Sequence, residues 1–270
     1  MAAGTELWRI HPGRPLDLDH IDPASVSGAP GDKATTEVAL AELQLRLRQL
    51  QARLAAERSR SLLVVLQGLD TAGKDGTVDH VFSGINPQGA KVASFKQPTA
   101  AELAHDFLWR VHRQAPAAGE IGIFNRSHYE DVLVVRVEKL APRRVWRARY
   151  AHINAFERLL AHGGTTVAKF FLHISYAEQT ARLRDRLDQP DKRWKLSPAD
   201  FTERSRFGDY QAAYAEALAK TSTDEAPWYA IPANHKWFRN YAVSRVLVET
   251  LEAMDPRFPH PPDLDALSFS

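Results

Sequence analysis

The chain has 270 residues, of which 44% are hydrophobic and 25% charged, and its formal net charge is +2. These values are typical of a globular protein with a sizeable core. No apolar run is long enough to span a bilayer, the first residues lack the layout of a signal peptide, and the absence of cysteine excludes disulfides and thiolate metal sites. We therefore expect a cytoplasmic enzyme that contacts no membrane.

The chain divides into two end segments and one central domain. Residues 1–33 contain several prolines, scattered glycines and no periodicity, so we expect an irregular arm that lies on the body or is partly disordered. Residues 34–255 contain one domain, which opens with a leucine-patterned helix over residues 36–59. Residues 256–270 are expected to form a loose tail.

A phosphate-binding loop is the strongest motif. The apolar residues 62–66 lead into Gly68-x-x-x-x-Gly73-Lys74, and a helical pattern follows. The two glycines let backbone N–H groups converge on an anion, the helix adds the positive end of its dipole, and Lys74 adds a full charge. The residues expected to bind phosphate here are Gly68, Ala72, Gly73, Lys74, Asp75, Gly76 and Thr77.

Two carboxylates distinguish this loop from the usual pattern, in which the lysine is followed by Ser or Thr. Asp75 takes that place, and Asp70 lies inside the loop. A carboxylate beside phosphate repels it unless a divalent cation lies between them, so we expect Asp70 to bind a metal. Asp75 fits either such a role or a helix cap.

Strands and helices then alternate, which predicts an α/β fold: a three-layer α/β/α sandwich with a parallel five-stranded sheet. Further strands are expected at 91–95, 121–125, 167–174 and 228–232, and helices at 76–83, 100–113, 128–138, 143–162, 177–187, 198–220 and 235–254. Ligands of such sheets bind beyond the carboxyl edge, where Lys96, Asn125 and Arg126 would join the loop.

The segment after the strand at 121–125 carries candidate metal and phosphate ligands. Asn125 stands where a carboxylate commonly anchors the metal, and Glu130 and Asp131 are alternative ligands between which the sequence does not decide. Arg126 would stabilise charge on a transferring phosphoryl group, or else form a structural ion pair with Asp70 or Asp131.

Two clusters of basic residues, at 136–149 and 182–195, fit either a polyanion partner or solvated helix faces. The second cluster is interrupted at Pro190 and surrounds Trp194. It predicts a mobile basic lid over about residues 182–206, with a polar surface hairpin as the alternative.

Several motifs together closely resemble the polyphosphate kinase 2 family. They lie at residues 61–77, 94–96, 105–110, 119–137, 169–175, 192–197, 221–223 and 228–236. The resemblance covers about residues 38–250, and several motifs in the same order are far more specific than a lone phosphate loop.

The resemblance implies a P-loop kinase-like, thymidylate-kinase-like core with a helical lid. It also implies reversible in-line transfer of the terminal phosphoryl group of inorganic polyphosphate to AMP, ADP or both, giving ADP and ATP, with Mg²⁺ or Mn²⁺ as its substitute. The implied catalytic residues are Asp70, Lys74, Arg126, Asp131 and Arg186. Asp70 and Asp131 would bind the metal, and further phosphate ligands would be Lys96, Arg110, Lys192 and Arg193. The nucleotide would contact Asn125, Arg126, Glu130 and Asp131, and we expect a homo-oligomer, a dimer or tetramer.

One departure from the family pattern bears on the acceptor. Residues 125–131 read Asn-Arg-Ser-His-Tyr-Glu-Asp, as in members that accept nucleoside monophosphates, rather than Asp-Arg-Ser-x-Tyr-Asn-Arg. This favours AMP and ADP as acceptors. Two alternatives remain: an ATP-dependent nucleotide or small-molecule kinase on the same fold, and a nucleic-acid-binding P-loop module. Trp146 and Trp194 are too few aromatic residues for the second, so we expect no nucleic acid partner.

Overall fold

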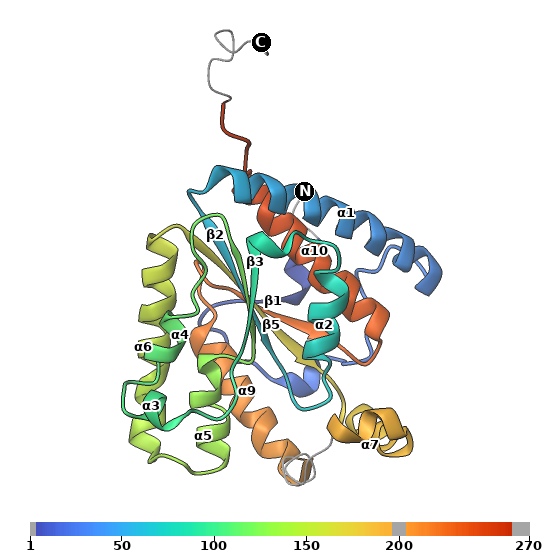
Figure 1. Cartoon of the computed structure of the whole chain (residues 1–270). Coiled ribbons are helices and arrows are strands. Elements are labelled where there is room, and N and C mark those ends of the chain that lie inside the picture. The colour runs from blue at the N-terminus through green and yellow to red at the C-terminus, as the bar shows by residue number, and fades with distance from the viewer. Residues whose placement is uncertain (1–3, 196–203, 261–270) are drawn as a thin grey trace, which may run out of the picture.

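The computed structural model describes residues 4–195 and 204–260, which contain one six-stranded mixed sheet (Figure 1). The strands are β1 (Arg9–Ile10), β2 (Ser61–Gln67), β3 (Ala90–Ser94), β4 (Ile121–Asn125), β5 (Thr165–His173) and β6 (Trp228–Pro232). Their order is β1-β6-β5-β2-β4-β3; β2 to β6 pair in parallel, and β1 pairs antiparallel with β6.

The predicted α/β class is confirmed, but the prediction of a five-stranded, wholly parallel sheet was wrong by one strand. The sixth strand, β1, lies in the N-terminal segment that the sequence indicated to be irregular. Its two residues are too few to show an alternating pattern. The preceding Trp8 is 4% exposed, and its ring packs edge-on against Phe238 at 5.9 Å, so this segment is part of the core.

Helices cover both faces of the sheet (Figure 1). The long helices are α1 (Lys33–Glu57), α6 (Arg143–His162), α7 (Tyr176–Asp188), α9 (Phe207–Thr221) and α10 (Lys236–Met254). The short ones are α2 (Lys74–Val81), α3 (Ala100–Leu103), α4 (Trp109–His112), α5 (Val134–Val137), η1 (Glu6–Trp8), η2 (Leu18–His20), η3 (Pro87–Gly89), η4 (His128–Asp131) and η5 (Pro190–Lys195).

The central strand β2 is buried along its whole length because alternate residues enter two different cores. Leu63 and Val65 pack with residues of α6 and α9, whereas Leu62 and Val64 pack with residues of α1 and α10. This explains why the strand reads as a continuous apolar run rather than an alternating one.

Two predicted helices are interrupted. The helix expected over residues 100–113 is split into α3 and α4, because the side chain of Asp106 accepts a hydrogen bond from the Leu108 amide at 2.9 Å and forms a turn. The helix expected over 128–138 is η4 followed by α5. Residues 196–203, which belong to the predicted lid and to the start of the helix expected at 198–220, lie outside the described residues.

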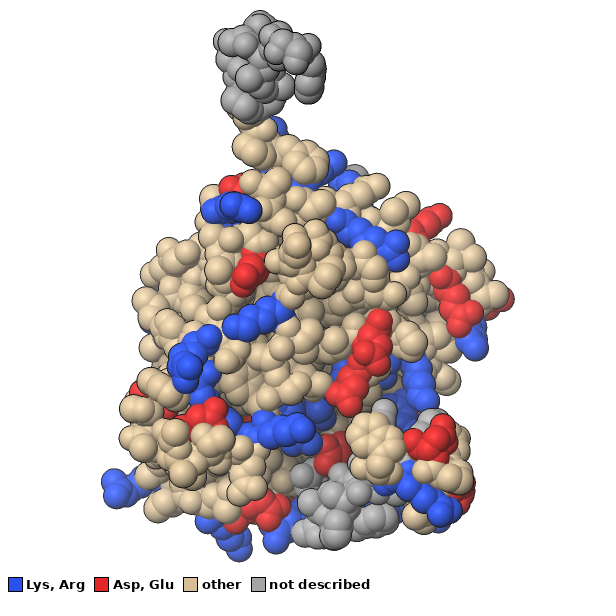
Figure 2. Space-filling model, viewed as in Figure 1, with Lys and Arg blue, Asp and Glu red and all other residues tan. Residues whose placement is uncertain are grey.

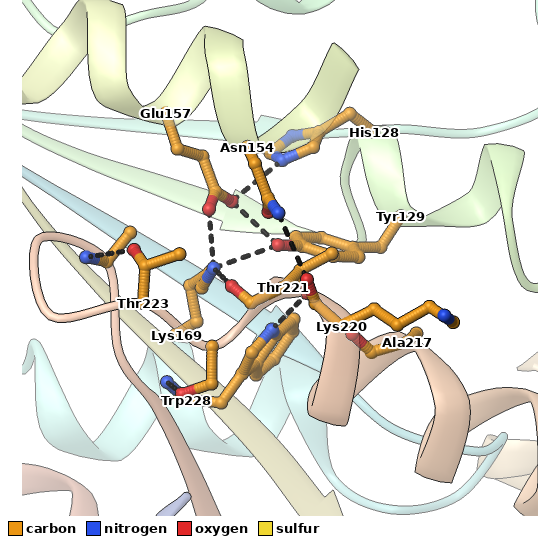
Figure 3. Close-up of polar contacts among 12 residues, drawn as sticks. His128, Tyr129, Asn154, Glu157, Lys169, Ala217, Lys220, Thr221, Thr223 and Trp228 are labelled. Carbon is orange, nitrogen blue, oxygen red and sulfur yellow. Dashed lines mark hydrogen bonds and ion pairs between the residues drawn. The ribbon is translucent and has the colours of Figure 1, made fainter. Parts of the chain in front are cut away.

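A buried ion pair links α6 to β5 (Figure 3). The Lys169 Nζ lies 2.5 Å from Glu157 Oε2, and the two side chains are 0% and 1% exposed. Lys169 also donates to the Tyr129 hydroxyl at 2.9 Å and to the Thr221 carbonyl at 2.7 Å. Burial raises the pKa of Glu157, but Lys169 and His128 more than offset it, so the net shift is downward and the carboxylate stays ionised.

This network anchors η4, the segment that follows β4. The Tyr129 hydroxyl donates to Glu157 Oε1 at 2.8 Å, and His128 Nε2 lies 3.1 Å from the same oxygen. Both rings are fully buried. The network therefore fixes the start of the segment that carries Glu130 and Asp131 to the sheet's carboxyl edge.

We predict that Lys169→Met lowers the free energy of unfolding by about 3–5 kcal/mol, because it leaves the Glu157 carboxylate buried without its cation. The double variant Glu157→Leu/Lys169→Met should regain part of this loss, since no charge then remains buried. Urea unfolding measures both, with the exposed Lys220→Met as the matched control. Equal unfolding midpoints for Lys169→Met and Lys220→Met would contradict the prediction.

Candidate functional site

The loop between β2 and α2 curls so tightly that its glycines have no room for a side chain. A Cβ on Gly68 would lie 2.8 Å from the Leu172 carbonyl oxygen, and one on Gly73, whose φ is +100°, would overlap the Arg239 guanidinium. Thr71, within the same loop, has a φ of +68°, a conformation that a non-glycine residue rarely adopts. Such strain is concentrated at functional sites.

Lys74 begins α2 and folds back over the loop. Its Nζ donates to the carbonyls of Gly68 at 2.6 Å and Leu69 at 3.2 Å, and lies 3.9 Å from Asp70 Oδ1. The side chain is only 9% exposed. The structure therefore places the lysine's charge inside the loop, next to the carboxylate that the sequence singled out.

Arg126, at the end of β4, joins two carboxylates. Its Nη2 donates to Asp70 Oδ1 at 2.6 Å, and its Nη1 lies 3.7 Å from Glu130 Oε2. Its φ of +61° turns the chain at this point. These side chains face a cavity lined by Gly68, Leu69, Asp70, Arg126, Glu130, Leu133, Val134, Tyr210 and Tyr214. The cavity thus combines the loop, the arginine and two of the predicted carboxylates.

The other carboxylates of the site have different partners. Asp131 accepts from Arg149 Nη1 at 2.9 Å, and burial raises its pKa while Arg149 opposes the shift. The Asp75 carboxylate accepts from Asn125 Nδ2 at 2.6 Å. Of the two carboxylates between which the sequence did not decide, Glu130 lies with Arg126 and Asp70, whereas Asp131 pairs with an arginine of α6.

Three predicted phosphate ligands lie outside this cluster. Lys96 is exposed, and its carbonyl accepts from Arg110 Nη1 at 2.8 Å. The Arg110 side chain is buried, with its guanidinium 5.5 Å from the centre of the Phe95 ring. Arg193 Nε donates to the Leu187 carbonyl at 2.7 Å.

The remaining lid residues are Arg186 and Lys192. Arg186, near the end of α7, is half-buried. The side chain of Lys192 lies outside the described part of the chain. The phosphate and catalytic roles of both residues stay predictions.

Two buried arginines support the loop. Arg239 was not assigned to the site from the sequence, and Arg182 was predicted as the first residue of a mobile lid, whereas the structure buries it against the loop. Arg182 Nη1 donates to the carbonyls of Thr71 at 2.9 Å and Ala72 at 3.2 Å, and Arg239 Nη1 donates to Ala72 at 3.4 Å. Burial, with the neighbouring Arg182 adding to it, lowers the pKa of Arg239 to about 10. A signal for Arg239 was available: it is a cation within the largely apolar pattern of α10.

The oxygen ligands at the cavity suit a hard divalent cation. Asp70 and Glu130 offer two carboxylates around one guanidinium. No group of three or more His, Cys, Asp or Glu side chains that could hold a metal occurs in residues 4–195 and 204–260. A cation here would therefore take one or two carboxylates and complete its shell with water or substrate oxygens, as Mg²⁺ commonly does.

Comparisons with known proteins agree with these features. The model of the family "Polyphosphate kinase 2 (PPK2)" matches residues 31–259. The chain is 54% identical to the AMP/ADP-polyphosphate phosphotransferase of Meiothermus ruber, over 94% of this chain and 95% of that protein. It is 42% identical to the ADP-polyphosphate phosphotransferase of Rhodopseudomonas palustris, over 96% and 93%.

A solved structure is also similar. The crystal structure of Polyphosphate Kinase 2 from Arthrobacter aurescens TC1 superposes with a TM-score of 0.93 at 44% identity, covering 97% of this chain and 93% of that one. Across the described ranges, no helix is both long and apolar enough to cross a membrane. The resemblance that the sequence motifs indicated is confirmed, and the chain belongs to the polyphosphate kinase 2 family.

Proposed function

We propose that this chain reversibly transfers the terminal phosphoryl group of inorganic polyphosphate to AMP and ADP. The observation that carries the proposal is the cluster of Lys74, Arg126, Asp70 and Glu130 at a glycine-rich loop that precedes a helix. The names of the two relatives, AMP/ADP- and ADP-polyphosphate phosphotransferase, support the same donor and acceptors. The Asn-Arg-Ser-His-Tyr-Glu-Asp segment at 125–131 favours a dual acceptor range.

The residues would act by positioning and charge neutralisation. The loop's N–H groups and Lys74 would bind the terminal phosphate, with the lysine exchanging its carbonyl partners for phosphate oxygens. Arg126 would neutralise negative charge on the phosphoryl group during its transfer. A nucleotide phosphate is already ionised, so the acceptor needs no general base. One phosphoanhydride replaces another, so the reaction should run in both directions.

We propose Mg²⁺, with Mn²⁺ as a substitute, as the cofactor. Asp70 would hold it together with Glu130 or Asp131, and the bound ion would neutralise phosphate oxygens on donor and acceptor. Arg126, whose Nη2 lies 2.6 Å from Asp70 Oδ1, would exchange this carboxylate for phosphate oxygens of the substrates. The thymidylate-kinase-like character of the core and the lid at about 182–206 belong to the same proposal.

We predict that the purified chain, mixed with AMP, polyphosphate and Mg²⁺, forms ADP and then ATP, resolved by anion-exchange chromatography. ADP alone would restrict the enzyme to monophosphate acceptors. If neither AMP nor ADP is phosphorylated while ATP in place of polyphosphate supports transfer, the chain is instead an ATP-dependent kinase. Tight binding of nucleic acid without any turnover would favour the binding module.

We predict that Asp70→Asn lowers kcat by about 10²-fold or more, because the neutral amide removes charge from the metal ligand set. The Mg²⁺ concentration for half-maximal rate should rise in the same variant, and a chelator should abolish turnover by the unmodified chain. The matched control is Asp79→Asn on the exposed face of α2, which should keep the original rate. Full activity of Asp70→Asn would contradict this assignment.

A further inference from the structure

A cluster of cations at the junction of α5 and α6 has no role in the proposed site. We call it the junction patch and define it as Lys139, Arg143, Arg144 and Arg147, all of which are exposed. Lys139 and Arg143 line a groove whose floor includes Trp146. Figure 2 shows Lys and Arg side chains, with acidic ones between them, at the lower left of the view, where α5 and the lower end of α6 lie in Figure 1.

The carboxylates near the junction patch are engaged by other arginines. Glu216 accepts from Arg136 at 2.8 Å, and Glu138 accepts from Arg206 at 2.7 Å. Among the residues that the structure describes, no carboxylate lies within 4.0 Å of the four patch cations. Their charges are therefore not neutralised by the acidic side chains of residues 4–195 and 204–260.

The arrangement of these cations is unfavourable in itself. Arg143 and Arg147 are four residues apart on α6, so their like charges repel on one face of the helix. Arg143 and Arg144 lie in the first turn, which holds no acidic residue and where the helix dipole disfavours cations. A multivalent anion bound across the patch would relieve both effects.

The topology brings the junction patch to the same edge of the sheet as the phosphate loop. Helix α6 ends at His162, shortly before β5 begins at Thr165 at the amino edge of the sheet. Because the helix is 20 residues long, its first turn lies at the opposite, carboxyl edge. Val134, at the start of α5, lines the cavity with Asp70, and Lys139 follows five residues later. The patch is thus the next surface along α5 from the site.

We propose that the junction patch binds the distal part of a long inorganic polyphosphate whose terminal phosphate lies at the loop. The inference rests on the proposed function and extends it to donor chain length. Charge favours this occupant, since a chain of phosphates matches a row of cations. A single-stranded nucleic acid shares the phosphates but also needs rings for its bases to stack on. Trp146 is buried beneath Arg136, whose guanidinium lies 4.9 Å from the ring centre.

The test compares donors of different length. In the triple variant Arg143→Gln/Arg144→Gln/Arg147→Gln, KM for long polyphosphate should rise about tenfold or more, while KM for tripolyphosphate and kcat stay unchanged. The slope of log KM for the long donor against log[salt] should decrease by about 2, because each of the three lost phosphate contacts contributes about 0.7 to that slope. The variant should be at least as stable as the parent, because like charges have been removed.

A second triple variant controls for net charge. Arg58→Gln/Lys91→Gln/Arg158→Gln removes three exposed cations that lie before β2, at the start of β3 and near the end of α6, all toward the opposite edge. Its KM for long polyphosphate should match that of the parent. Equal effects of the two triple variants, or equal effects of the patch variant on short and long donors, would overturn the proposal.

Direct titration with long polyphosphate separates this proposal from the proposed function. If the parent chain binds long polyphosphate and the patch variant binds it at least tenfold more weakly, the proposal that the junction patch binds polyphosphate is supported even if no turnover is detected. If the variant instead loses affinity only for single-stranded RNA of similar charge, the patch is a nucleic acid surface and the proposal is wrong. Unchanged affinity for long polyphosphate refutes it as well.

Discussion

The buried Glu157–Lys169 pair is the interaction on which the position of the site depends. Removing two charges from water is costly, and here the cost is offset by several short hydrogen bonds to Lys169 and Glu157 rather than by one contact. Because Tyr129 and His128 are tied to the same carboxylate, the backbone after β4 has little freedom. Arg126 lies two residues before His128 and Glu130 directly follows Tyr129, so the core's polar network determines where they stand.

The phosphate loop is held from its other side by cations. Arg182 and Arg239 donate to loop carbonyls at Thr71 and Ala72, and Arg182 also reaches the carbonyls of Ala233 and Asn234 after β6. Carbonyl oxygens that are turned toward these arginines do not face a bound anion. The same guanidinium groups add positive potential beneath the loop, in a buried setting where it is weakly screened.

Local patterns predicted the parts of the fold that short-range rules determine. The predicted bounds of β4, β6 and α6 are those of the structure, because apolar periodicity alone defines them. The two-residue strand β1 depends on pairing with β6, and the break at Asp106 depends on one side-chain hydrogen bond. The residues of the candidate site show the same contrast between what local sequence patterns predict and what contacts between distant segments determine. Topology predicted that Asp70 and Arg126 share one edge of the sheet and left an ion pair of Arg126 with Asp70 or with Asp131 as an alternative; the structure has the pair with Asp70. The pairing of Asp131 with Arg149 arises from the packing of α6 and could not be read locally.

Two groups of cations in this chain have different chemical uses. At the phosphate loop, Lys74 and Arg126 already have partners, carbonyls and carboxylates, that a phosphate or a metal ion can replace. Such exchange suits groups whose contacts must change during a reaction, since each lost interaction is replaced by another. Along α6, Arg143 and Arg147 repel each other and are near no described carboxylate, so a bound polyanion gains their full attraction without displacing a partner. Exchangeable cations at the phosphate loop and exposed cations along α6 are the arrangement that we propose for a polymeric donor, whose distal phosphates would extend beyond the loop.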